Sequence, residues 1–340
     1  MNTRNISRIL LSFLGILALI LDGRTALLGA AEGIRLCIRT VIPSLFPFLF
    51  FCGILTNTLW GTTSPLLRPA ARLLGVPKGG ESLMIAGFLG GYPAGAQAIG
   101  DACRTGRLDP GDGARLLTCC CNAGPGFLFG MIAPQFSSGT TVFHLWMLQI
   151  LSACMTGVLF CRDGSASCSL SSNTASISRI LRDSVLTMGL ICGWILLFRV
   201  LLSFLERWLL WFFSPELQVA VTGLLELSNG CCGLSAIRDE SLRFLVCAGM
   251  LSFGGICVAM QTASVIGSLP LSAYLLGKVV QTLLSLVLAV LFLRLGSIFY
   301  PISVLLLLLL SKIRKKLWIS RSSRCIMPVS PPGGKRHAVS

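Results

Sequence analysis

The stretch Ile85-Ala-Gly-Phe-Leu-Gly-Gly-Tyr-Pro-Ala-Gly-Ala-Gln97 is followed, after a polar loop, by Cys119-Cys-Cys-Asn-Ala-Gly-Pro-Gly-Phe-Leu-Phe-Gly130. Both segments are apolar enough to enter a bilayer, yet each carries Gly and Pro where a spanning helix would be continuous. Proline removes a backbone donor and clashes with the preceding turn, so each proline predicts the start or the end of a helix. Unwound backbone at membrane depth is tolerated only inside protein or beside a wet cavity. The stretch therefore predicts a small-solute path through a membrane.

Composition places the whole chain in the membrane. Hydrophobic residues make up 54% of the 340 residues and charged residues 12%, whereas a soluble domain has about a quarter charged residues. This predicts an all-α, polytopic helical membrane protein with room for about seven to nine spans of roughly 20 residues. The net charge of +15 comes from Lys and Arg that punctuate the apolar runs, as topology signals do. No nucleic-acid recognition motif accompanies them, so we expect a lipid bilayer and no nucleic acid as partner.

The sequence carries no signal for a metal, a cofactor or catalysis. The 15 cysteines and 2 histidines do not form the clustered, regularly spaced ligand sets of zinc or iron–sulfur sites. A buried free cysteine behaves as a small hydrophobe. No nucleophile is paired with a base in the pattern. We therefore expect neither an enzyme nor a cofactor.

The two halves of the chain share a layout. Each has a regular span, a Gly-rich break, a polar loop, a second Gly-rich break and another regular span. Breaks at matching places in two halves predict a binding site near the bilayer midplane, between two structural repeats. The sequence leaves open whether the repeats are inverted and whether a broken segment doubles back as a re-entrant hairpin. The broken segments are expected at 81–100, 115–133, 215–236 and 242–266.

The domain boundaries follow from this layout. A Ser-rich, flexible stretch separates the halves, and a basic tail expected in the cytoplasm follows the second half. The expected parts are an N-terminal span with an amphipathic helix (1–40), a first repeat (41–161), a linker (162–178), a second repeat (179–296), and a C-terminal hydrophobic run with the basic tail (297–340).

The start of the chain allows alternatives. Residues 9–21 predict a first span, although the short apolar run also fits a cleavable signal peptide. Residues 23–39 are amphipathic, which is typical of a helix lying in the interface plane. In the span expected at 41–60, Pro43 predicts the helix start and Pro47, one turn deeper, predicts a kink.

Two charged residues interrupt the apolar sequence of the second half. A charge at bilayer depth costs a few kcal/mol on insertion scales, so such residues usually face a cavity. Glu226 is therefore a candidate site residue, and the alternative is a solvated residue at a helix end. Lys278 lies on an otherwise apolar span, and its alternative is a lysine that extends to the interface.

The candidate site residues lie at the breaks or beside them. Glycine pairs at a break let backbone approach a ligand or another helix closely, and both explanations fit Gly254-Gly255. Gln97, Asn122 and Gln261 add side-chain amides. The full candidate set is Gly91, Tyr92, Pro93, Gln97, Asn122, Pro125, Glu226, Asn229, Gly254, Gly255, Gln261 and Lys278.

These residues also carry a family resemblance. The chain resembles the sporulation integral membrane proteins of the YlbJ type, which belong to the larger set with a nucleoside-recognition, or Gate, domain. The resemblance covers about residues 42–294. It rests on Pro43-Ser-Leu-Phe-Pro-Phe48, Gly91-Tyr-Pro-Ala-Gly-Ala96, Asn122 to Gly130, Leu225-Glu226 with Asn229-Gly230, Phe253-Gly-Gly255 with Gln261, and Lys278.

The resemblance implies a function and a location. It implies passage of dipicolinate, a small aromatic dicarboxylate, from the mother cell into the developing spore, and hence a cell membrane or the outer forespore membrane. Members of the wider set are linked instead to nucleosides or ions. A non-transporting assembly or signalling partner of sporulation is a further alternative, and a homo-oligomer is left open.

An anionic solute is compatible with the sequence. Half-helix N-termini at the breaks present unpaired amides and positive dipole ends, which form a ready anion site. Lys278 adds a positive charge to such a site. Glu226 fits it only by taking up a proton or by binding a cation with the solute, so Glu226 predicts proton or cation coupling.

Overall fold

The computed structural model describes residues 3–160 and 175–324. All regular structure in these ranges is helical, without a strand. Five helical runs are long and apolar enough to cross a membrane, so the prediction of an all-α, polytopic membrane protein is confirmed. Most of the predicted linker and the end of the basic tail lie outside the described residues. The five runs are Gly23–Thr58, Gly139–Phe160 (α9), Ile177–Trp208 (α10), Glu240–Val265 and Leu271–Leu295 (α15).

The first long run joins two segments that the sequence analysis separated. α2 (Gly23–Leu36), the π-helical turn η1 (Cys37–Val41) and α3 (Ile42–Thr58) follow one another without a break. The prediction that Pro43 starts the span is therefore wrong. A π-helical turn directly before the proline relieves the local hydrogen-bond mismatch, which is why the helix continues through it.

The amphipathic face of α2 packs against α10. A Cβ added to Gly29 would lie 3.2 Å from the Cα of Val200, so the two backbones approach closely. Arg199 of α10 donates hydrogen bonds to the carboxylates of Glu32 and Glu206. The polar residues of α2 are thus partly used in a helix–helix contact.

The first broken segment doubles back as a helical hairpin. α5 (Ser82–Ile85) and the π-helical turn η2 (Ala86–Gly90) form one arm, and α6 (Ala94–Arg104) forms the other. The arms touch through glycines, since a Cβ on Gly95 would lie 2.7 Å from the Cα of Gly87. At the tip, Gly91 has φ +79°, a conformation that glycine adopts without steric penalty.

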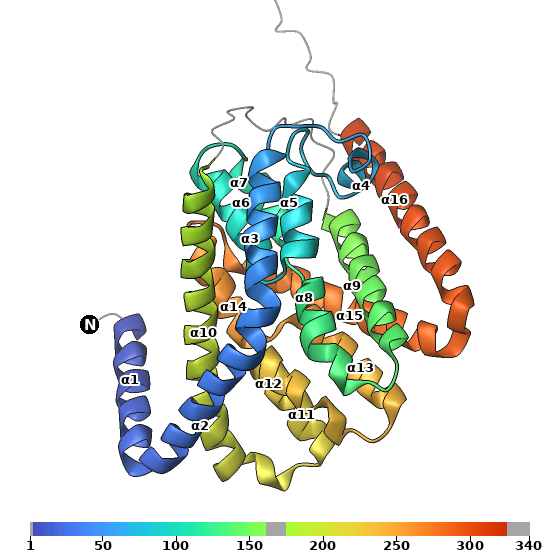
Figure 1. Cartoon of the computed structure of the whole chain (residues 1–340). Coiled ribbons are helices and arrows are strands. Elements are labelled where there is room, and N and C mark those ends of the chain that lie inside the picture. The colour runs from blue at the N-terminus through green and yellow to red at the C-terminus, as the bar shows by residue number, and fades with distance from the viewer. Residues whose placement is uncertain (1–2, 161–174, 325–340) are drawn as a thin grey trace, which may run out of the picture.

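The third broken segment forms a second hairpin of the same kind. Its arms are α11 (Pro215–Leu225) and α12 (Leu227–Cys232), and Glu226 between them is extended, with φ −140° and ψ 114°. A Cβ on Gly230 would lie 2.2 Å from the Cα of Gly223. The first hairpin lies at one end of the molecule and the second at the opposite end (Figure 1).

The other two broken segments are helices with a central interruption. α7 (Pro110–Leu117) is separated from α8 (Pro125–Phe127) and η3 (Leu128–Ile132) by irregular backbone. α13 (Glu240–Phe253) is separated from α14 (Gly255–Val265) at Gly254, which has φ +83°. The predicted interruptions are therefore all present.

Each hairpin tip packs against the interruption that follows it in the chain. In the first half, a Cβ on Gly91 would lie 2.9 Å from the amide nitrogen of Gly124. In the second half, a Cβ on Gly255 would lie 3.4 Å from the carbonyl oxygen of Leu225. The hairpins approach from opposite ends, as inverted repeats would, but the repeat relationship itself stays a prediction.

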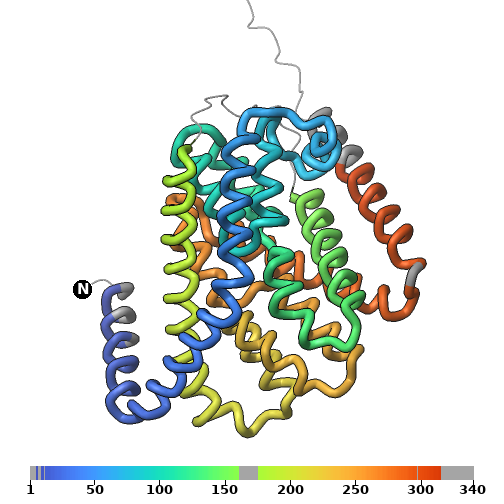
Figure 2. Tube along the Cα trace, in the orientation of Figure 1, coloured from blue at the N-terminus to red at the C-terminus, as the bar shows by residue number. Residues whose placement is uncertain are grey.

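The remaining helices lie around this centre. α1 (Thr3–Leu21) stands to one side of the bundle next to α2 (Figure 2). Its apolar part, Ser12–Leu21, is shorter than the five spanning runs, so the first span predicted at 9–21 is a helix outside that set. The others are α4 (Arg68–Leu73), α16 (Phe299–Arg324), and the short turns η4 (Ala133–Gln135), η5 (Leu210–Phe212), η6 (Leu234–Ala236) and η7 (Gly296–Ile298).

Candidate functional site

Lys278 of α15 lies at the point where the first hairpin tip meets the interruption after α7. Its side chain is 0% exposed. The ammonium donates to the Tyr92 hydroxyl at 3.1 Å, to Oε1 of Gln281 at 2.7 Å and to the Cys121 carbonyl. Within the described part of the chain, no carboxylate forms an ion pair with it. The lysine therefore does not extend to the interface.

A glycine brings the lysine to this point. Gly277 directly precedes Lys278, and a Cβ there would lie 2.4 Å from the Cα of Thr118. The backbone of α15 thus lies directly against the interruption that begins at Thr118. From that distance the lysine side chain reaches the Cys121 carbonyl.

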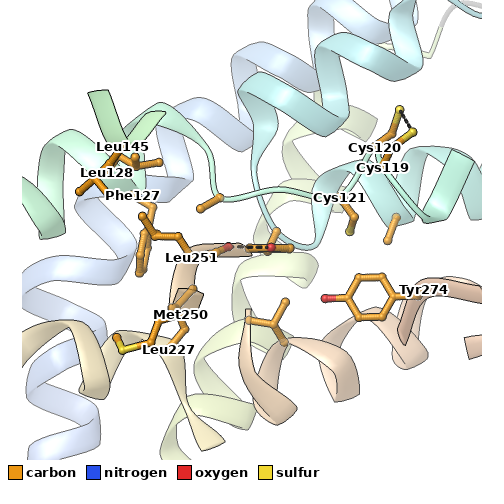
Figure 3. Packing of buried hydrophobic residues seen from close by; sticks show 14 of the residues in the cluster. Cys119, Cys120, Cys121, Phe127, Leu128, Leu145, Leu227, Met250, Leu251 and Tyr274 are labelled. Atoms are coloured by element: carbon orange, nitrogen blue, oxygen red, sulfur yellow. Dashed lines mark hydrogen bonds between the residues drawn. The ribbon is translucent and has the colours of Figure 1, made fainter. Parts of the chain in front are cut away.

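The hydrogen bonds around Lys278 join separate elements. Tyr92 at the first hairpin tip donates to the Leu251 carbonyl of α13 at 3.1 Å. Asn122 accepts from Nε2 of Gln281 at 2.8 Å and donates to the Cys119 carbonyl at 2.7 Å. Figure 3 shows Cys121, Leu251 and Tyr274 around one point, with the Tyr274 hydroxyl directed towards it. The network therefore ties a hairpin tip and a helix interruption to α13 and α15.

Glu226 occupies the tip of the second hairpin and is 1% exposed. Its carboxylate accepts from the amide of Ser228 at 3.0 Å, and from the amide and the side chain of Asn229 at 2.7 Å each. Glu226 therefore caps the N-terminus of α12, where a negative charge is favoured. Its burial excludes the solvated helix-end alternative.

A small cavity lies between the two tips. It measures about 30 Å³, and its lining includes Tyr92, Gly124, Glu226 and Gln261. A space of this size holds about one water molecule. Tyr92 therefore separates the two buried charges, because its hydroxyl binds Lys278 while the residue also lines the cavity that Glu226 lines.

A larger cavity, of about 640 Å³, lies between α3, α6 and α10. This is within the usual size range of small-molecule sites. It extends from Ala86 and Ala94 of the first hairpin to exposed Arg104 and Arg179 at its mouth. The first hairpin contributes residues of its arms to the lining and none of its tip, so the hairpin separates this cavity from the centre.

The predicted site residues fall into groups, and one lies apart. Tyr92, Asn122 and Lys278 share the hydrogen-bond network, whereas Glu226, Asn229 and Gln261 gather at the second tip. Gln97 lies in the larger cavity, where its Oε1 accepts from the Thr187 hydroxyl at 2.7 Å. Gln97 is therefore apart from the central network, because α6 turns this side chain towards α10, and its role as a site residue stays a prediction. The remaining candidates shape the backbone: Gly91, Gly254 and Gly255 have positive φ, Pro93 precedes α6, and Pro125 begins α8.

Sequence reasoning missed part of the centre. Tyr274 and Gln281 of α15 are 0% exposed and lie beside Lys278. Their spacing from Lys278, four residues before and three after, places all of them on one helical face. Polar residues at this spacing on an otherwise apolar span predict a buried polar face, so Tyr274 and Gln281 could have been identified from the sequence. Thr262 follows the candidate Gln261 and was expected to face the same cavity, whereas the carbonyl groups of Cys121 and Leu251 carry no comparable signal.

No protein-family model matches the chain, and no curated protein or solved structure matches it. The resemblance to the YlbJ type therefore stays a prediction from the quoted residues. Function has to be inferred from the geometry of the centre.

Proposed function

We propose that the protein is a membrane transporter of a small, polar or anionic metabolite. One observation carries the proposal. Two helical hairpins from opposite ends meet two interrupted helices at a centre that buries Glu226 and Lys278, neither of which has an ion-pair partner among the described residues. Buried charges and opened backbone inside a membrane protein are the usual components of a solute pathway.

The charge distribution supports an orientation. Arg68, Arg72, Arg104 and Arg179 lie at the end of the molecule that carries α4 and the mouth of the larger cavity (Figure 1). Basic residues collect on the cytoplasmic side of membrane proteins. We place this mouth and the C-terminal tail in the cytoplasm, so the larger cavity serves as the cytoplasmic access route.

The central cavity supports a gated mechanism. At about 30 Å³ it is too small for a dicarboxylate or a nucleoside, whereas the larger cavity ends on the arms of the first hairpin. Movement of that hairpin would connect the two cavities. Separation of the second hairpin from the break at Gly254 would open the opposite side, and alternation between these movements transports the solute.

The resemblance to the YlbJ type names dipicolinate as the solute, taken up into the forespore during sporulation. The uncompensated charge of Lys278 and the helix N-termini at the breaks suit an anion. Glu226 adds proton or cation coupling, because a second negative charge opposes anion binding unless it is neutralised.

The test is solute accumulation in vesicles that contain the full-length protein. Dipicolinate is compared with nucleosides, with and without a pH gradient. We expect dipicolinate to accumulate, with a rate that depends on the gradient in wild-type protein and not in Glu226→Gln. Accumulation of nucleosides instead would assign the nucleoside function of the wider Gate set. Absence of uptake for every solute would favour the assembly or signalling role.

A further inference from the structure

Two buried hydroxyl groups at the centre, those of Tyr274 and Thr262, lie beside each other without a well-formed hydrogen bond. Tyr274 precedes Lys278 by one turn on α15, and its ring centroid lies 5.8 Å from the ammonium nitrogen. Thr262 of α14 lies beside Tyr274 and Cys121. Both side chains are 0% exposed, and neither hydroxyl makes a hydrogen bond with acceptable geometry. Buried polar groups are nearly always paired, so these two hydroxyls require an explanation.

The helix interruption at Gly254 lies beside the Tyr274 hydroxyl. A Cβ on Gly254 would lie 3.2 Å from the Tyr92 hydroxyl and 3.5 Å from the Tyr274 hydroxyl. α14 begins at the next residue and has no side-chain cap. The Tyr274 hydroxyl therefore lies close to the positive end of the α14 dipole, where a negative group is stabilised, whereas Thr262 lies near the other end of α14.

The charge at this point is uncompensated. Lys278 donates to a phenol, a carbonyl and an amide, which are all neutral acceptors. A buried cation is normally paired with a negative group. A buried cation, the hydroxyls of Tyr274 and Thr262, and the α14 N-terminus beside Tyr274 together match the needs of a carboxylate.

We infer that Lys278, Tyr274 and Thr262 form the subsite for a carboxylate group of the transported solute. The inference rests on the transport function proposed above. It states that the solute carries a carboxylate, and that this carboxylate binds on the Lys278 side of Tyr92. The hydroxyls donate to the carboxylate oxygens, and the ammonium supplies the opposite charge. A hydrogen bond to a carboxylate is about twice as strong as one to a neutral group. Lys278 therefore exchanges the Tyr92 hydroxyl for the carboxylate, which releases the first hairpin tip.

Equilibrium binding to the full-length protein in nanodiscs tests the subsite. The probes are benzoate and benzamide, which have the same shape and differ in charge. Binding raises the melting temperature in proportion to the logarithm of ligand concentration above Kd. We expect benzoate to raise it and benzamide to have no effect over the same range. Loss of a charge-assisted bond in Lys278→Met should weaken benzoate roughly ten- to a hundredfold, and Tyr274→Phe or Thr262→Val about two- to tenfold.

The hydroxyl variants keep the test decisive if Lys278→Met does not fold. Tyr274→Phe and Thr262→Val remove no hydrogen bond from the empty protein, so their melting temperatures without ligand should equal that of wild type or exceed it. Ser82→Ala is the matched control, because Ser82 on α5 also carries a buried hydroxyl without a partner. Its benzoate affinity should be unchanged.

Several outcomes would overturn the subsite. They are equal binding of benzoate and benzamide, no benzoate-dependent shift, or wild-type benzoate affinity in both hydroxyl variants. The two proposals, the subsite and the transport function, can fail independently of each other. Benzoate binding that depends on these residues in a protein without uptake supports the subsite and removes the carrier. Uptake that is unaffected by all three variants retains the carrier and removes the subsite.

Discussion

The two hairpin tips solve the same packing problem with different chemistry. The first tip carries Tyr92, whose hydroxyl is held from outside the hairpin by Lys278 and the Leu251 carbonyl. The second tip carries Glu226, whose carboxylate is held by its own hairpin through Ser228 and Asn229. A tip tied to other helices moves only when those bonds exchange, whereas a self-capped tip can move as a unit. Under the proposed transport function, this difference predicts solute-controlled release at the first tip and the coupling charge at the second.

Glycine substitutions in the hairpin arms have the largest expected effect. One substitution disrupts the packing of the first hairpin and another that of the second. A Cβ in Gly95→Ala would lie 2.7 Å from the Cα of Gly87 on the other arm, and one in Gly230→Ala 2.2 Å from the Cα of Gly223. Such contacts with backbone force the arms apart, at about 1–3 kcal/mol or more. Thermal unfolding of the purified protein measures the loss.

Gly189→Ala on α10 is the control for these variants, since nothing lies within 4 Å of its added Cβ. Alanine in a helix interior is favoured over glycine by about 0.5–1 kcal/mol. The control should therefore melt at the wild-type temperature or above it. Arm variants that melt like the control would contradict the close approach of the arms.

Lys278→Met has the next largest effect, and it acts on the first tip. The change removes one of the two external hydrogen bonds of Tyr92 and the positive charge of the centre. Solute uptake in vesicles should fall roughly ten- to a hundredfold, the equivalent of one charged hydrogen bond of about 1.5–3 kcal/mol. Lys312→Met is the matched control, because Lys312 is an exposed residue of α16. Equal uptake in the two variants would remove Lys278 from the pathway.

Two substitutions of Glu226 separate charge from capping at the second tip. In Glu226→Gln an amide oxygen can still accept from the α12 amides, so stability should stay close to wild type while uptake loses its response to a pH gradient. Glu226→Ala also removes the cap, which costs about 0.5–2 kcal/mol. Melting temperature and gradient-driven uptake are measured for both. A gradient response that survives in the glutamine variant would assign the coupling elsewhere.

The smallest expected effect is a coupling between substitutions in the free energy of unfolding. It tests whether the two tips are held by different partners. Tyr92→Phe loses the bonds to Leu251 and Lys278, at about 1 kcal/mol each. Combined with Lys278→Met, it should be non-additive by about 0.5–3 kcal/mol, as for residues that share a hydrogen bond. Combined with Glu226→Gln, it should be nearly additive. Thermal unfolding of both double-mutant cycles gives the comparison, and equal coupling would show that the tips are not held differently.

The fold was predictable where local chemistry decides it. Pro125 and Gly254 disrupt a helix through their own backbone properties, and the interruptions are located where these residues predict them. The doubling back of the hairpins was left open, because it depends on contacts between arms. The pairs Gly87 with Gly95 and Gly223 with Gly230 permit it, but the sequence does not show that they face each other.

The site was predictable in part for the same reason. Glu226 and Lys278 stand out as charges in apolar sequence, and both are buried at the centre. The position of Gln97 in the larger cavity was not predictable, because its direction depends on the rotation of α6 against α10. Thr262 follows Gln261 in the sequence and was expected to face the same cavity, but its position beside Tyr274 is set by packing between α14 and α15. Tertiary packing, rather than residue type, decides these cases.

A density map of the full-length protein in nanodiscs at saturating dipicolinate tests the central claim most directly. We predict density for the solute between the two hairpin tips, in contact with Lys278 and within reach of Tyr274 and Glu226. The same map should show Tyr92 moved away from Lys278. Solute density confined to the larger cavity near Arg104 and Arg179, with the bond between Tyr92 and Lys278 intact, would contradict a binding site at the meeting point of the tips.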